Sequence, residues 1–234
     1  MDWAISSNEG VLFLLRWGHF IFGIAWIGVL WYFNFIQGPF FAETSPEVKM
    51  AATQKLVPRA LWWFRWGAMG TFLTGWAIIA MRFAQAGDQG AALMNSSWGL
   101  TIMTGSLFGS LMWFNVWFII WPRQKKVIAS ANGEKIENLP AVARRAFLAS
   151  RTNTLLSIPL LFFMGAASHL VVPVNPANVG IWMTVVLAVL ILAEVNALMA
   201  DKGPTIKPIE KVKGVITTGL ILTAILYVLL EVIV

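Results

Sequence analysis

Residues 122–152 read PRQKKVIASANGEKIENLPAVARRAFLASRT, and seven of them are basic: Arg123, Lys125, Lys126, Lys135, Arg144, Arg145 and Arg151. The stretch lies between two long apolar runs of the sequence. Basic segments that flank membrane spans are retained on the cytoplasmic side of the membrane. The stretch therefore predicts a membrane protein with several spans, and it fixes the direction in which each span runs.

The composition also indicates a membrane protein. Of the 234 residues, 58% are hydrophobic and only 12% are charged, whereas about 25% of the residues of a soluble domain are charged. Several runs approach or exceed the ~20 apolar residues that a helix needs to cross a bilayer. We expect one all-α transmembrane domain over residues 1–234, with six spans at about 11–35, 60–83, 97–121, 153–173, 178–199 and 212–234.

The charge distribution supports this number of spans. If 122–152 is cytoplasmic, six spans place segments 36–59 and 200–211 on the same side, and both segments contain several basic residues. The predicted outer loops 84–96 and 174–177 contain no Lys or Arg, and both chain termini fall on the outer side. The formal net charge of +6 is thus explained by topology and by attraction to anionic lipid, rather than by binding to nucleic acid.

The first and third spans share a local pattern. Trp31-Tyr32-Phe33-Asn34 lies in the inner half of the first span, and Trp113-Phe114-Asn115 lies at a similar depth in the third, which runs in the same direction. The pattern is either the trace of an internal duplication or a coincidence in a chain in which 13% of the residues are aromatic.

The chain contains two histidines and no cysteine, which excludes disulfides, thiolate metal sites and covalent c-type haem. His19 and His169 belong to the first and fourth spans, and a rise of ~1.5 Å per residue puts them ~5 and ~9 Å outside the midplane. Two imidazoles at similar depth predict the axial ligands of a b-type haem, with Arg16 one turn from His19 to meet a propionate. Two alternatives stay open: each histidine hydrogen-bonds a neighbouring helix, or a methionine such as Met164 replaces one ligand.

Polar residues also gather in the cytoplasmic half of the spans. Charged side chains inside a bilayer are costly and usually face the interior of the bundle. Arg65 and Glu194 lie at comparable depth, so they form either a structural ion pair or part of a pocket that faces the cytoplasm. In such a pocket Arg65 and Asn115 would bind a planar anion, and Glu194 would accept a proton. The same group contains Asn34, Arg151, Asn153 and Asn196.

Several aromatic-rich motifs resemble the membrane domain of bacterial membrane-bound urate hydroxylase, the urate oxidase N-terminal family. The resemblance extends over about residues 11–200. The motifs are Arg16-Trp17-Gly18-His19 with Gly23, Trp26, Ile27 and Gly28, then Trp62-Trp63-Phe64-Arg65-Trp66-Gly67, Met112-Trp113-Phe114-Asn115-Val116-Trp117, Ser150-Arg151-Thr152-Asn153-Thr154 and Ser168-His169.

The resemblance implies oxidation of urate to 5-hydroxyisourate in the bacterial inner membrane, with water as the source of oxygen and a cytochrome c as electron acceptor. Typical members carry a c-type cytochrome domain after the last span. This sequence has no cysteine and therefore no Cys-x-x-Cys-His motif, so a separate cytochrome c on the outer side would have to accept the electrons.

The sequence leaves two other functions open. The chain could be a non-catalytic accessory subunit of a respiratory or photosynthetic membrane complex, in which case a large partner would co-purify with it. It could also be a membrane protein that handles haem or copper, which metal analysis would reveal.

Overall fold

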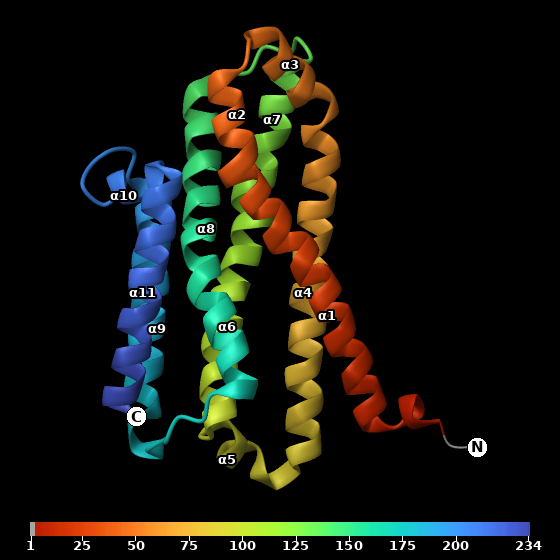
Figure 1. Ribbon diagram of the computed structural model, residues 1–234, viewed down its shortest axis with the longest axis vertical. Coiled ribbons are helices and arrows are strands. Elements are labelled where there is room, and N and C mark those ends of the chain that lie inside the picture. The colour runs from red at the N-terminus through yellow and green to blue at the C-terminus, as the bar shows by residue number, and fades with distance from the viewer. Residues whose placement is uncertain (1–2) are drawn as a thin grey trace.

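The computed structural model describes residues 3–234, and these residues form helices and connecting turns without a strand (Figure 1). Residues 1–2 of the predicted domain lie outside this range. The first half of the chain contains η1 (Ala4–Ser6), α1 (Asn8–Trp31), η2 (Tyr32–Gln37), α2 (Gly38–Glu43), α3 (Pro46–Lys55), α4 (Val57–Ala86), η3 (Gly87–Gln89), α5 (Gly90–Met94) and α6 (Ser97–Phe114). The second half contains η4 (Asn115–Ile120), α7 (Trp121–Ala131), α8 (Leu139–His169), η5 (Pro176–Asn178), α9 (Val179–Met199), α10 (Lys207–Glu210) and α11 (Val212–Ile233).

The structure confirms the prediction of an all-α protein with helices that are long and apolar enough to span a membrane. In the part of the chain that the structure describes, five helical stretches are long and apolar enough to span a membrane. The predicted first, third, fourth, fifth and sixth spans correspond to these stretches, which are in order Asn8–Glu43, Ser97–Ala131, Leu139–His169, Pro176–Met199 and Val212–Ile233. The predicted second span lies within α4, a helix of 30 residues that is long enough to cross a bilayer but less apolar than the other five.

The long helices stand side by side in one bundle (Figure 1). α2, α3, α7 and the start of α8 lie at its upper end, and α10 lies towards the same end. α5, the 170–178 connection and both chain ends lie at the lower end. The three segments for which the charge pattern predicts a common side therefore do share one end of the molecule, and α4 runs the length of the bundle between the two ends.

α8 is the central helix of the bundle, because it packs against α6, η4, α7, α9 and α11. Its buried face includes polar side chains as well as apolar ones, among them Arg151, Asn153 and Ser157. α1 packs mainly along α4 and diverges from α8 towards its own N-terminus (Figure 1). The contact of α1 with α4 is close because Gly67 lies against the backbone of Phe22 and Trp26.

Two helices contain a π-helical segment, and both segments coincide with the repeated aromatic–asparagine pattern. η2 begins at Tyr32 and includes Asn34, while η4 begins at Asn115. A π-helical turn widens the helix and is often found at functional sites. The two asparagines both point to α8, as the hydrogen bonds described below show, so the sequence pattern corresponds to a shared structural feature.

Candidate functional site

A chain of buried and half-buried polar side chains links α8 to η4 and α9. Asn115 donates through Nδ2 to Asn153 Oδ1 at 3.0 Å and to Glu194 Oε2 at 2.9 Å. Asn153 in turn donates through Nδ2 to the carbonyl oxygen of Met112 at 2.9 Å. We call Asn115, Asn153 and Glu194 the Asn115 cluster. The sequence analysis placed all three residues in the inner polar group, and the structure brings them into direct contact.

Two acceptors of the Asn115 cluster have no partner. Glu194 Oε1 and Asn115 Oδ1 are both buried without a hydrogen bond. A buried acceptor is costly unless a donor reaches it. A carboxyl group that takes up a proton becomes a donor itself, so this arrangement suits a carboxylate that receives a proton.

Asn34, in η2, makes a similar contact with α8. It is 4% exposed, and its Nδ2 donates to Leu30 O at 2.9 Å and to Ser150 Oγ at 2.8 Å. The π-helical segments of α1 and α6 therefore each present an asparagine to the same part of α8. This shared role was not predictable from the sequence pattern alone, because Ser150 and Asn153 lie more than a hundred and nearly forty residues from their respective partners.

Arg65 is not part of the Asn115 cluster, and the predicted ion pair with Glu194 is not formed. No carboxylate of residues 3–234 lies within 4.0 Å of the Arg65 guanidinium. Its Cζ atom instead lies 3.6 Å from the ring centroid of Trp121 and 5.7 Å from that of Trp117. Arginine stacks readily on indole rings, and this contact replaces the expected carboxylate.

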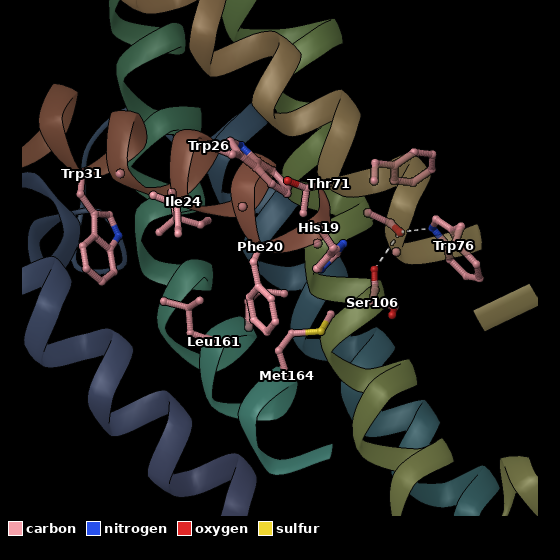
Figure 2. Close-up of a pocket in the computed structure, with 18 residues that line it drawn as sticks. His19, Phe20, Ile24, Trp26, Trp31, Thr71, Trp76, Ser106, Leu161 and Met164 are labelled. Carbon is pink, nitrogen blue, oxygen red and sulfur yellow. Dashed lines mark hydrogen bonds between the residues drawn. The ribbon is translucent and has the colours of Figure 1, made fainter. Parts of the chain in front are cut away.

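His19 lines an apolar cavity of about 400 Å³ between α1, α4, α6 and α8 (Figure 2). Its Nδ1 lies 3.1 Å from Thr74 Oγ1. The Thr74 hydroxyl also lies 2.6 Å from Gly70 O and 3.2 Å from Thr71 O, and the tautomer in which His19 Nδ1 donates to Thr74 Oγ1 satisfies these groups. In that tautomer Nε2 carries the lone pair. Gly75 makes room for the ring, since a Cβ atom there would lie 2.9 Å from His19 Cε1.

The two histidines do not line the same cavity. His169 is the last residue of α8 and is exposed. α8 contributes Leu160, Leu161 and Met164 to the cavity instead, and the Met164 side chain is drawn beside His19 in Figure 2. Arg16 is half-buried on α1, and it is not among the residues that line the cavity.

Thr74 and Trp26 belong to this region, and the sequence analysis gave neither of them a role in a site. Thr74 lies 55 residues from His19 in the chain, and no local pattern links the two. Trp26 is 1% exposed and lines the cavity, and its Nε1 has no hydrogen-bond partner. The places of Thr74 and Trp26 beside the cavity depend on how α1 packs against α4, so the sequence of one helix could not predict them.

Comparison with known proteins connects this arrangement with one family. The model of the family described as urate oxidase N-terminal matches residues 88–228. The match contains the whole Asn115 cluster and His169, whereas His19 and Arg65 lie before it. No curated protein and no solved structure matches the chain. Because the match covers more than half of the sequence, the chain belongs to the urate oxidase N-terminal family.

Proposed function

We propose that this chain is a membrane oxidoreductase that oxidises urate at the basic end of its helical bundle. The observation that carries the proposal is the Asn115 cluster, which holds a carboxylate inside the bundle and lies within the region that matches the family. Glu194 is also the only carboxylate of the sequence that lies well inside a predicted span. A membrane protein keeps such a residue at a cost, and usually for a functional reason.

The reaction consumes one water molecule. Urate gains a hydroxyl group at a ring carbon and releases two electrons and two protons, which gives 5-hydroxyisourate. In this proposal Glu194 accepts one of the protons on Oε1, because that oxygen is buried and has no partner. Asn115 holds the other carboxylate oxygen and thus fixes the orientation of the acceptor.

The released electrons require an acceptor, and the cavity around His19 suits a b-type haem. The fit rests on the donor set: His19 can present Nε2 while Nδ1 donates to Thr74, and Met164 offers a second ligand atom in the same cavity. Such a haem would supply transfer of single electrons. We therefore propose His19 and Met164 as the ligand pair, with His169 as the alternative partner that the sequence suggested.

The basic end of the bundle faces the cytoplasm in this proposal. Positive charge near span ends is retained on that side. The bacterial inner membrane is the location that the resemblance to urate hydroxylase implies. The opposite end, with both termini (Figure 1), then faces outward, where a separate cytochrome c can collect two single electrons for each urate.

The test is urate consumption coupled to reduction of added cytochrome c in membranes that contain this chain. Glu194→Gln keeps the size and the hydrogen bond to Asn115 but cannot accept a proton. We expect it to slow urate consumption by about 10²–10⁴-fold. The matched control is Glu231→Gln, since Glu231 is exposed near the end of α11, and it should retain the rate. Membranes with a correctly folded parent chain that neither consume urate nor reduce cytochrome c would refute the proposal.

A further inference from the structure

We propose that Arg151 is the anion-binding residue of this protein, in a polar pocket where η2, α4, α7 and α8 meet. The inference rests on the proposed function, since it identifies where the charge of the urate anion is bound. It assigns this role to a different arginine from Arg65, for which the sequence analysis proposed it.

Arg151 is a buried cation without a protein counter-ion. Its residue is 5% exposed, and its Nε and Nη1 atoms are buried without a hydrogen-bond partner. No carboxylate of the described residues lies within 4.0 Å of it. The one recorded contact of its charged group is with the Phe147 ring, whose centroid lies 5.2 Å from Cζ. A buried charge with unused donors is costly unless something pairs with it, so the missing partner is best supplied by a ligand.

The space for such a ligand is beside the guanidinium. A cavity of about 200 Å³ is lined by Arg151 together with polar and aromatic side chains. Asn34, Gln37 and Gln124 are the amides, and the Oε1 atom of Gln37 is buried without a partner among the described residues. The residues that supply flat apolar walls are Phe33, Phe64 and Phe147. The pocket thus offers unused donors, an unused acceptor and aromatic faces.

These features define the chemical class of the ligand. The donors of Arg151 require an acceptor with negative charge, and a guanidinium binds a planar group with two acceptors most effectively. Gln37 Oε1 requires an N–H or O–H donor on the same ligand. The volume is below the ~300–1,000 Å³ of typical ligand sites, which favours a single heterocyclic base over a nucleotide. A singly charged oxopurine such as urate satisfies all these conditions.

The position of the pocket allows a water-soluble anion to reach it. Arg151 lies 18 residues before the end of α8, which corresponds to ~27 Å along the helix axis. A hydrocarbon core of ~30 Å would therefore place Arg151 near the boundary of the membrane when His169 lies at the opposite boundary. In Figure 1 α7 and the start of α8, which carry most of the basic segment, lie at the upper end of the bundle.

The pocket and the Asn115 cluster share a level of α8 but lie on different sides of it, since no residue of the cluster lines the pocket. Arg151 and Asn153 are two residues apart, which is ~3 Å along the axis but about 200° around it, so they lie at nearly the same depth on different faces of α8. The cavity of His19 begins at Leu160, nine residues or ~14 Å further along the same helix. From its N-terminal to its C-terminal part, α8 therefore contributes Arg151 to the anion pocket, Asn153 to the Asn115 cluster and Leu160 to the wall of the His19 cavity.

The experiment measures urate binding to the purified full chain in detergent, by calorimetry and by the shift of its thermal unfolding midpoint. Arg151→Gln is compared with Arg123→Gln, because Arg123 lies in α7 outside the pocket and its Nη1 already donates to Ile119 O. Hypoxanthine, a neutral oxopurine, serves as the uncharged probe. We expect Arg151→Gln to raise the Kd for urate about 10- to 100-fold, while Arg123→Gln leaves it within twofold and hypoxanthine binds weakly to all three proteins.

A second readout separates ligand binding from a structural role. Without urate, Arg151→Gln should unfold at the same temperature as the parent or a higher one, because it removes a buried charge that lacks a partner. Added urate should raise the midpoint of the parent and not that of the variant. An unchanged Kd, or a variant that unfolds at a lower temperature yet binds urate normally, would overturn the assignment.

The same measurements distinguish this inference from the proposed function. If urate binds in an Arg151-dependent way but no electrons reach cytochrome c, the pocket stands and the proposed oxidation fails. If urate is oxidised equally well by the parent and by Arg151→Gln, with the same KM, the oxidation stands and the pocket assignment fails.

Discussion

Replacing Gly67 by alanine should separate α1 from α4 and destabilise the protein. A Cβ atom at this position would lie 2.9 Å from Trp26 N, 3.1 Å from Phe22 O and 3.2 Å from Trp26 Cα. All three neighbours are backbone atoms of α1, so no side-chain rotation can relieve the contact, and the helices must move apart. Small residues at helix contacts in membranes permit this close approach.

The size of the effect follows from two opposing terms. Overpacking a close contact costs about 1–3 kcal/mol, while alanine gains about 0.5–1 kcal/mol over glycine within a helix. We expect a net loss of about 1–2 kcal/mol for Gly67→Ala, which lowers the unfolding midpoint by about 3–6 °C. Gly165→Ala in α8 is the control, because a Cβ atom there would meet nothing within 4 Å and should leave the midpoint unchanged or raise it.

The assay is thermal unfolding in detergent at a fixed scan rate, followed by circular dichroism. Equal midpoints for the two variants would show that α1 and α4 do not touch at Gly67, and the description of the His19 cavity would then be wrong as well. The cavity depends on this contact because His19 and its partner Thr74 come from α1 and α4.

Two further variants test the site itself. His19→Ala should abolish the b-type haem spectrum of the purified protein and Met164→Leu should shift it, whereas His169→Ala should leave it unchanged; loss of the signal only in His169→Ala would contradict the assignment of ligands. Asn115→Leu should destabilise the protein by about 1–3 kcal/mol because it leaves a buried oxygen of Glu194 without its donor, and adding Glu194→Leu should restore much of that stability, as measured by the same thermal unfolding. A double variant that is no more stable than Asn115→Leu would show that the hydrogen bond to Glu194 does not carry this cost.

The positions of the helices were largely predictable from the sequence, because crossing a bilayer demands long apolar runs and charge between them is confined to the ends. The predicted second span at 60–83 falls inside α4, although its arginines, glycines and tryptophans make this helix less apolar than the others. Depth along each helix was also predictable, and it placed Asn115, Asn153 and Glu194 in one group correctly.

The contacts within a layer of equal depth were not predictable, because depth says nothing about the direction in which a side chain points around its helix. Arg65 was paired with Glu194 on depth alone, and it stacks on Trp121 instead. His19 was paired with His169 for the same reason, yet α1 packs along α4 and places Thr74 beside His19. Arg151 was part of the inner group, but only the packing of four segments shows that its donors face a pocket without a counter-ion.

The most direct test of the account is the reduced-minus-oxidised spectrum of the purified chain, recorded without oxygen before and after addition of urate. We predict that urate produces the bands of a reduced b-type haem, with two equivalents of haem reduced per urate consumed, and that Glu194→Gln slows their appearance. A protein whose haem is reduced by dithionite but unaffected by urate would contradict the central claim that this bundle takes electrons from urate.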